Sequence, residues 1–270
     1  MTAFLITIAA IFGVVLGSFL NALAYRLPRG ESLMTRSHCT KCDKQITAWE
    51  NIPVLSWLAL RGKCSKCKNP ISLQYPLVEA FVGLSFAGAM WSAARIAPPV
   101  ESTGATLAAA IMFFSFIFVG VLVALIDLKT MTIPSKAVWS GLAVALVALL
   151  GYLLITGDWQ RALQAVIAAA AVSFVYFAIF FFKDGGVGFG DVRLSVFVGL
   201  VLGFVSPGVA VLGFFLPWVL AALWLIPSFI KKTVSGKDKI PFGPWLVLGT
   251  ILAIVFGDIV VKFYLQLGSY

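Results

Sequence analysis

Two aspartates lie at the ends of long apolar segments, where a charged side chain is costly. Asp127 closes one apolar run, in Ala-Leu-Ile-Asp-Leu-Lys, and Asp191 adjoins another, in Gly-Phe-Gly-Asp-Val-Arg-Leu. A carboxylate at the edge of hydrocarbon costs several kcal/mol, so it indicates a functional site. Two carboxylates that meet cannot both ionise easily, so one keeps a proton and acts as acid while the other activates water as base. We therefore predict that Asp127 and Asp191 are a catalytic pair.

The residues beside the two aspartates favour short, constrained loops. Gly188 and Gly190 precede Asp191, and glycines permit close approach of another backbone, such as an extended peptide. Pro134 follows Asp127 by seven residues and can begin the next helix in its first turn. Gly188 and Gly190 are accordingly auxiliary candidates for the site.

A structural role for either aspartate is the main alternative. Asp191 could be the N-cap of the segment that follows it. Asp127 could form a surface ion pair with Lys129 or Lys136. Two acids on one face, each beside a constrained loop, favour catalysis over capping.

The four cysteines form two C-x-x-C pairs with 21 residues between them, at Cys39, Cys42, Cys64 and Cys67. Two such pairs can complete a tetrahedral four-thiolate zinc site that leaves no position open, so the metal would be structural. Reduced unmetallated pairs, a redox pair and an iron–sulfur cluster are the alternatives. His38, the only histidine, is interpreted as a solvated loop residue, which disfavours histidine-dependent catalysis.

The elements that must position these residues are membrane-spanning helices. The chain is 61% hydrophobic and 11% charged, whereas soluble domains have about 25% charged residues. The sequence predicts an all-α polytopic membrane protein of about eight helices. The predicted segments are 2–25, 76–94, 105–126, 134–156, 161–182, 192–206, 208–230 and 242–264. The sixth is short, and seven helices with a re-entrant piece there is the alternative.

The charges predict how the chain crosses the bilayer. Of the 20 Lys and Arg residues, nine lie in the first loop, two in the third, two in the fifth and four in the seventh. Only Arg95, Arg161 and Lys262 fall on the other side. The positive-inside rule then places the odd-numbered loops in the cytoplasm and the N-terminus outside. Both aspartates would emerge on the cytoplasmic face, and a basic charge distributed in this way indicates a membrane rather than nucleic acid as partner.

The same segmentation predicts three parts of the chain. Residues 1–25 would form the first transmembrane helix, which lacks the features of a cleavable signal peptide. Residues 26–75 would form a cytoplasmic zinc-binding loop domain. Residues 76–270 would form a seven-helix membrane domain that carries the catalytic aspartates.

At these residues the chain resembles the type IV prepilin peptidase family, the bifunctional leader peptidase/N-methyltransferases. The resemblance covers nearly the whole chain, through five motifs in order. They are Gly17-Ser-Phe-Leu-Asn21 with Arg26-Leu-Pro28, the paired C-x-x-C loop with Tyr75-Pro-Leu-Val-Glu79, Asp127 with Ile133-Pro134, Gly188-Phe-Gly-Asp-Val-Arg-Leu194, and Ile240-Pro-Phe-Gly-Pro244.

The resemblance implies an intramembrane aspartyl protease of the G-x-G-D type. Such enzymes remove a short basic leader from prepilins or pseudopilins on the cytoplasmic side of the inner membrane. Many then methylate the new N-terminus with S-adenosylmethionine. Asp127 and Asp191 match the catalytic aspartates, and the four cysteines match a zinc-binding loop. Whether the partner system builds pili or secretes proteins stays open.

Some positions depart from the family's pattern or have no assigned role. Phe189 stands where methionine or tyrosine is frequent, Arg193 where lysine is frequent, and Ser135 where an acidic residue is common. Asp184 and Glu79 are auxiliary site candidates. For Asp184 the alternative is a solvated loop charge, and for Glu79 it is a helix N-terminal carboxylate favoured by the dipole.

Two functions from other classes remain as alternatives. A transporter could use membrane-edge aspartates to relay protons or bind cations, although it would be expected to show broken helices near the midplane. A zinc-stabilised membrane scaffold could use both aspartates as helix caps. A protease should lose cleavage when either aspartate becomes asparagine, whereas a scaffold should tolerate both changes.

Overall fold

The computed structural model describes residues 1–32, 35–182, 187–230 and 241–267, and helices dominate these residues. The long helices are α1 Thr2–Arg26, α3 Gln74–Ile96, α4 Pro99–Thr130, α5 Ser135–Thr156, α6 Trp159–Phe182, α7 Phe189–Val205, α8 Pro207–Ile230 and α9 Gly243–Leu267. Between α1 and α3 lie the short helix α2 Leu55–Ala59 and two 3-10 turns, Leu27–Arg29 and Trp49–Asn51. The described residues form isolated β-bridges but no strand.

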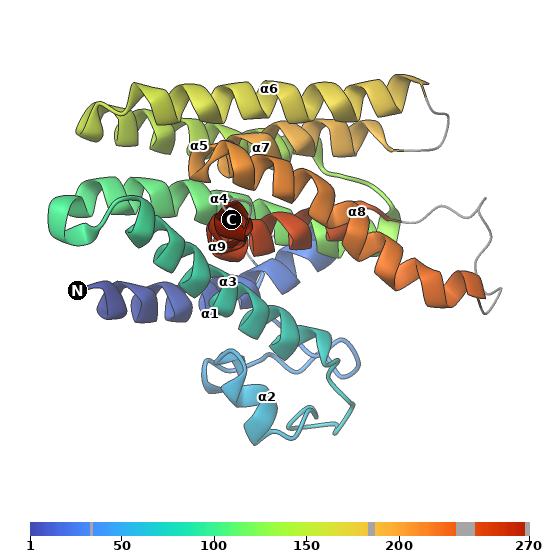
Figure 1. Ribbon diagram of the computed structural model, residues 1–270. Coiled ribbons are helices and arrows are strands. Elements are labelled where there is room, and N and C mark those ends of the chain that lie inside the picture. Colours follow the sequence, from blue (N-terminus) through green and yellow to red (C-terminus); the bar gives the residue numbers. More distant parts are fainter. Residues whose placement is uncertain (33–34, 183–186, 231–240, 268–270) are drawn as a thin grey trace. The chain divides into compact units, whose positions relative to one another are not determined.

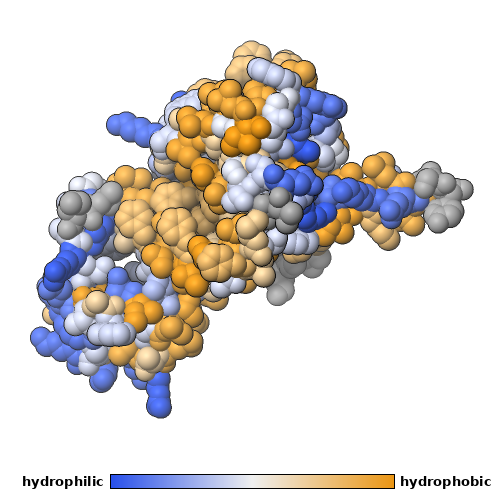
Figure 2. Space-filling view, turned by 90° about the vertical axis from the view of Figure 1, so that its left-hand side faces the viewer, coloured by the Kyte–Doolittle hydropathy of each residue, from blue (hydrophilic) through white to orange (hydrophobic). Residues whose placement is uncertain are grey.

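Within the described residues, seven helices are long and apolar enough to cross a membrane, namely α1, α3, α4, α5, α6, α8 and α9. Large apolar side chains are exposed along them, and Figure 2 shows broad hydrophobic areas on the molecular surface. Exposed apolar helix faces are suited to lipid rather than water. The predicted all-α membrane fold is confirmed.

The sixth predicted segment corresponds to α7, which differs from the other long helices. It is one continuous helix of 17 residues, about 25 Å long, against a hydrocarbon core of about 30 Å. Nearly every residue from Val192 onward is buried. A helix surrounded by other helices need not match the bilayer thickness, because its ends meet protein instead of lipid. The helix begins at Phe189, three residues before the predicted start at 192, so Asp191 lies inside its first turn.

The described chain divides into two compact units, Ala3–Gly88 and a larger unit of Met1–Thr2 with Ala89–Tyr270. In the first unit, α1 packs antiparallel against the first part of α3. A Cβ at Gly17 would lie 2.7 Å from the Glu79 Cα, and one at Gly83 would lie 2.5 Å from Val14. These glycines allow the two backbones to approach closely. The predicted boundaries after residues 25 and 75 stay predictions.

In the larger unit, α6 and α7 lie side by side and antiparallel (Figure 1). Gly199 faces Ala168 and Gly203 faces Gln164, with backbone atoms of α6 2.5–2.8 Å from where a Cβ would stand. The later residue of α7 therefore pairs with the earlier residue of α6, as expected for antiparallel helices. Glycine and alanine therefore fix a close and specific register between the two helices.

Helix α4 passes beside α7 and α9. Phe116 makes an edge-to-face contact with Phe197 at 5.1 Å between ring centroids, and Phe113 contacts Phe204 at 5.9 Å. A Cβ at Gly120 would meet Val247 of α9 at 2.9 Å. Because Asp127, further along α4, bonds to Gly243 at the start of α9, α4 is antiparallel to both neighbours and its C-terminal end meets their N-terminal ends.

Candidate functional site

The two predicted catalytic aspartates meet at one end of the larger unit. Asp127 lies in the last turn of α4 and Asp191 in the first turn of α7. The antiparallel packing of these helices brings the two turns to the same level, and the carboxylates are close enough to interact electrostatically. Only 5% of Asp127 and 7% of Asp191 is exposed. The packing of these helices, which the sequence did not establish, is therefore present.

Asp127 is held by a backbone group from a distant part of the chain. The N–H of Gly243, at the start of α9, donates a hydrogen bond to Asp127 Oδ2 at 3.1 Å. No ion pair joins Asp127 to Lys129 or Lys136, both of which are described. The alternative of a surface ion pair is wrong. The carboxylate instead faces a neutral donor in a buried setting.

Asp191 combines a capping contact with a free oxygen. Its Oδ2 accepts a hydrogen bond from the Gly188 N–H at 3.0 Å, which satisfies a donor at the start of α7. Its Oδ1 is buried and has no hydrogen-bond partner among the described residues. Asp191 is thus not the N-cap of α7, which is Gly188, but one of its oxygens binds the N-cap N–H from the third position of the helix. The second oxygen remains available for chemistry.

The glycines around the site allow neighbouring groups to approach more closely than any side chain would permit. A Cβ at Gly243 would lie 2.8 Å from Asp127 Oδ2, and a Cβ at Gly190 would lie 2.8 Å from the Ile133 Cβ. A Cβ at Gly188 would lie 3.3 Å from Asp191 Oδ2. Gly188 therefore lies against Asp191 and Gly190 against Ile133, and a role for either glycine in catalysis stays a prediction. Gly243 had no predicted role, although its motif was part of the resemblance.

Arg193 contacts two other residues at positions that depart from the family's pattern, Ser135 and Phe189. The guanidinium of Arg193 in α7 donates to the Ser135 hydroxyl at the start of α5, and it also stacks over the Phe189 ring at 4.5 Å. The side chain of Arg193 thereby links the start of α5 to the first turns of α7.

Of the remaining auxiliary candidates, Glu79 has a definite partner and Asp184 lies outside the described residues. Glu79 is buried in α3 and its Oε2 accepts the Val54 N–H at 2.7 Å. It thereby joins the loop domain to α3 within the smaller unit. Asn21 of α1 likewise donates to the Tyr75 carbonyl at 3.2 Å.

The four cysteines converge as predicted. All four Sγ atoms lie within 4.8 Å of one another, and the Cys39 and Cys67 sulfurs are 3.8 Å apart. Zinc–thiolate bonds of about 2.3 Å in a tetrahedron separate the sulfurs by about 3.8 Å. The thiol donors and their spacing therefore fit a four-coordinate metal ion.

Each pair of cysteines forms the same backbone knuckle. The Cys39 N–H donates to Lys44 O at 2.9 Å, and the Cys64 N–H donates to Asn69 O at 2.9 Å. In both knuckles the residue after the second cysteine has a positive φ, 51° at Asp43 and 58° at Lys68. The repetition makes two equivalent half-sites from local sequence alone.

One polar network links the two knuckles. Lys44, beside the first knuckle, contacts Glu50 Oε1 at 2.6 Å and also donates to the Ser65 hydroxyl in the second. Hydrogen bonds from Lys44, Ser65 and the Thr47 backbone lower the pKa of Glu50 to about 2. The Glu50 carboxylate therefore stays ionised at any pH that the cell maintains.

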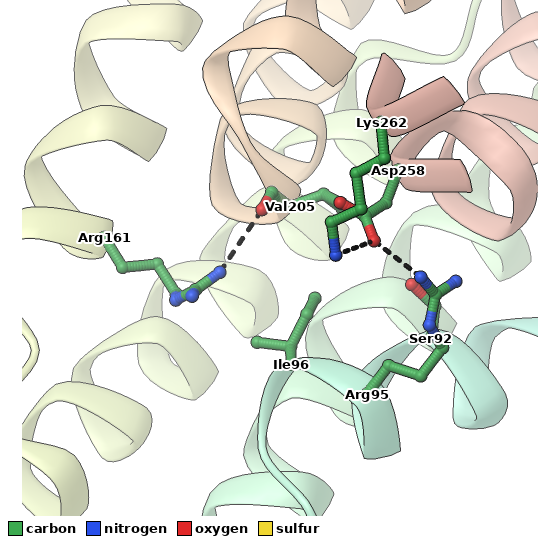
Figure 3. A pocket seen from close by; sticks show the side chains of 7 residues that line it. All are labelled: Ser92, Arg95, Ile96, Arg161, Val205, Asp258 and Lys262. Atoms are coloured by element: carbon green, nitrogen blue, oxygen red, sulfur yellow. Dashed lines mark hydrogen bonds and ion pairs between the residues drawn. The ribbon is translucent and has the colours of Figure 1, made fainter. Parts of the chain in front are cut away.

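A second polar site lies at the far ends of α7 and α9, about 21 Å along the helices from the aspartates. Figure 3 shows a hollow of about 140 Å³ there, lined by Ser92, Arg95, Ile96, Arg161, Val205, Asp258 and Lys262. Asp258 accepts from Arg95 at 2.6 Å and from Lys262 at 2.9 Å. Arg161 donates to the Phe204 and Val205 carbonyls that end α7. These contacts tie helix ends together.

Comparisons with known proteins agree on one family. Residues 11–93 match the description "Bacterial Peptidase A24 N-terminal domain", and residues 113–236 match "Type IV leader peptidase family". Three relatives are named prepilin leader peptidase/N-methyltransferase. The Bacillus subtilis protein is 31% identical over 97% of this chain and 99% of its own. The Pseudomonas putida protein is 31% identical over 98% of this chain and 95% of its own. The Aeromonas hydrophila protein is 33% identical over 94% of this chain and 92% of its own. No solved structure matches the chain.

Proposed function

The chain belongs to the type IV leader peptidase family, and we propose that it removes the basic leader from type IV prepilins or pseudopilins as an intramembrane aspartyl endopeptidase. One observation carries the catalytic assignment. Asp127 and Asp191, from different helices, lie buried at one end of the bundle, and each is held by a glycine N–H. Neither has a cationic partner among the described residues. The two acids thus have the buried, neutral surroundings that a shared-proton pair requires.

The proposed reaction uses the two carboxyl groups in opposite protonation states. The carboxylate takes a proton from water as the water oxygen attacks the scissile carbonyl carbon. The neutral carboxylic acid protonates the leaving amine as the C–N bond breaks. Burial and proximity keep the second group neutral, because two adjacent carboxylates resist double ionisation. Glycines 188 and 243 let the chain lie close against Asp191 and Asp127, where a Cβ would crowd the two carboxyl groups.

Methylation of the new N-terminus is the second proposed activity. The relatives' names include N-methyltransferase, and their similarity covers nearly the whole chain. S-adenosylmethionine would supply the methyl group. No residue of this chain is assigned to its binding.

The four-cysteine site is proposed to hold zinc. Cys39, Cys42, Cys64 and Cys67 would all be ligands, which leaves no position for water or substrate. The metal would stabilise the loop domain and take no part in cleavage. Four thiolates suit zinc, and the predicted cytoplasmic location disfavours disulfides.

The protein is a multi-pass membrane protein, and we place its active site on the cytoplasmic face of the inner membrane with the N-terminus outside. The distribution of lysine and arginine supports this orientation. The leader of a prepilin would then reach the aspartates without crossing the bilayer. The transporter alternative has no support from the relatives, which are named as peptidases.

The experiment that tests the proposal is co-expression with a candidate prepilin and mass spectrometry of the product. Asp127→Asn and Asp191→Asn should each reduce leader removal at least about 100-fold at equal membrane abundance, since each removes an acid/base group. Methylation would add about 14 Da, the mass of one CH₂, to the mature N-terminus. The methylated amine would keep its positive charge.

Asp258→Asn is the matched control, because Asp258 lies in the same unit at the other end of α9. It should cleave at a rate close to wild type. Unimpaired cleavage by both Asp127→Asn and Asp191→Asn would contradict the proposed catalytic pair.

A further inference from the structure

Three buried polar side-chain atoms have no hydrogen-bond partner among the described residues. They are the Tyr176 hydroxyl, the Trp218 indole Nε1 and Asp191 Oδ1. Buried polar groups are nearly always paired, so each exception asks for an explanation. One of the three belongs to a proposed catalytic residue, and the other two are neutral donors. The positions of the Tyr176 hydroxyl and the Trp218 indole relative to Asp191 decide whether the three groups form one site.

The register between α6 and α7 places Tyr176 beside Asp191. Gly199 faces Ala168, and Gly203 faces Gln164. Moving eight residues from the first pair toward the N-terminus of α7 and the C-terminus of α6 reaches Asp191 and Tyr176. Both helices rise about 1.5 Å per residue, so the two residues lie at the same level along the helix pair. The phenol also lies within electrostatic reach of the Asp191 carboxylate.

Aromatic packing places Trp218 in the same group. The Tyr176 ring stacks on Trp218 at 5.9 Å between centroids and at an interplanar angle of 29°. Both rings pack on Phe242, at 6.3 Å from Tyr176 and 4.6 Å from Trp218. Phe242 directly precedes Gly243, whose N–H holds Asp127. The two unpaired donors therefore adjoin the residue that precedes the support of Asp127.

The rigidity of this group argues against a role as a flexible surface feature. Tyr176 is fully buried, and its ring also meets Phe214 edge to face at 5.7 Å. Phe214 and Trp218 lie one turn apart on α8, so they hold Tyr176 from the same face. A hydroxyl fixed in this way keeps its direction when substrate arrives.

Two fixed neutral donors beside an unpaired carboxylate oxygen match the needs of a peptide carbonyl under attack. Negative charge develops on the carbonyl oxygen as water adds, and preorganised donors stabilise that charge more than the ground state. We infer that the Tyr176 O–H and Trp218 Nε1–H form an oxyanion-binding site for the scissile carbonyl of the prepilin. The inference rests on the proposed peptidase function.

The chemistry needs no further reactant. As the water oxygen bonds to the carbonyl carbon, the π electrons of the C=O bond move to its oxygen, and the water proton passes to the carboxylate. Tyr176 and Trp218 donate hydrogen bonds to that oxygen and keep their protons. When the C–N bond breaks, the electrons return to the C=O bond and the neutral carboxyl group protonates the amine.

Tyr176→Phe tests the site, because it removes one hydroxyl and keeps the ring. We expect kcat for leader cleavage to fall about 100-fold or more, as for loss of one oxyanion donor, with KM changed by less than about threefold. The melting temperature in detergent should stay the same or rise, since no internal hydrogen bond is lost. Trp218→Phe should also reduce kcat.

Tyr152→Phe is the matched control. Tyr152 is a buried tyrosine of α5, packed on Phe204 near the opposite end of α7, and its hydroxyl is not among the unpaired atoms. It should leave kcat near wild type. Wild-type kcat in Tyr176→Phe would overturn the inference, as would a loss of kcat accompanied by an equal loss of folded enzyme. Wild-type and Asp191→Asn enzymes assayed in parallel report on the peptidase function itself, so its failure would be distinguishable.

Discussion

At the scale of single residues, the site is built from carboxyl groups held by backbone donors. Gly243 and Gly188 donate N–H groups to Asp127 and Asp191, and no lysine or arginine among the described residues pairs with either acid. A cationic partner would fix the ionised form and prevent proton exchange. A neutral donor orients the carboxyl group and leaves its proton free to move. The choice of partner is therefore part of the proposed chemistry.

Gly243→Ala should damage the site while preserving the fold. The added Cβ would stand 2.8 Å from Asp127 Oδ2, so the carboxylate must move away from its position. A displacement of this kind costs about 100-fold in rate when geometry is critical. Cleavage assays at matched membrane abundance check this, with melting temperature as the measure of folding. A variant that cleaves like wild type would show that Asp127 tolerates the shift.

At the scale of elements, small residues set the distances between helices and the register of the site. Gly199 and Gly203 lie one turn apart on α7 and contact the backbone of α6. This contact sets the register of the two helices, and that register places Tyr176 and Asp191, each eight residues away, at the same level. Helix α7 itself is short and surrounded by protein, which suits an element that positions a catalytic residue more than one that meets lipid. The glycine contact thus serves both stability and alignment.

Gly199→Ala should separate α6 from α7. Its Cβ would stand 2.5 Å from the Ala168 carbonyl oxygen and 2.6 Å from the Ala169 Cα, and backbone atoms cannot turn aside. Overpacking of this kind costs about 1–3 kcal/mol. Thermal unfolding in detergent should show a lower midpoint.

Gly151→Ala provides the comparison, because a Cβ at Gly151 in α5 meets no atom within 4 Å. That change should be neutral, or stabilising by up to about 1 kcal/mol, since alanine favours helix. Equal midpoints for the Gly199 and Gly151 variants would refute the proposed close contact.

At the scale of the whole molecule, the two compact units are stabilised by different interactions. The larger unit is a bundle held by apolar packing, with ion pairs such as Arg95–Asp258 joining helix ends. The loop between α1 and α3 in the smaller unit has few buried apolar residues, and its two halves meet at the four cysteines and at the Lys44–Glu50 network. A small domain without a sizeable core commonly needs a metal to remain folded.

Metal removal should therefore unfold the loop domain selectively. Metal analysis of purified protein should find about one zinc ion per chain. A chelator should expose the thiols of Cys39, Cys42, Cys64 and Cys67, which are the chain's only cysteines, so thiol titration reports this site alone. Proteolysis should then occur between residues 35 and 73. Retention of four protected thiols in metal-free protein would contradict a metal-dependent loop domain.

The sequence by itself determined the features that depend on local information. Hydrophobic length predicted the helices, since a spanning helix is a property of one continuous segment. The spacing of each C-x-x-C pair predicted its knuckle, and the approach of the two knuckles followed from four-thiolate coordination. Asp127 and Asp191 were recognisable because charge at an apolar edge is costly wherever the helix packs.

Only the tertiary structure decided which distant groups complete the site. The hydrogen bond from Gly243 to Asp127 spans 116 residues, and the pairing of Tyr176 with Asp191 follows from the glycine register of α6 and α7. The partnership of Arg193 with Ser135 likewise depends on how α5 and α7 meet. Apolar helices carry little sequence signal for their rotation or register, because lipid and protein interior are both apolar. Close packing of small side chains selects one arrangement, and that arrangement places the donors around the acids.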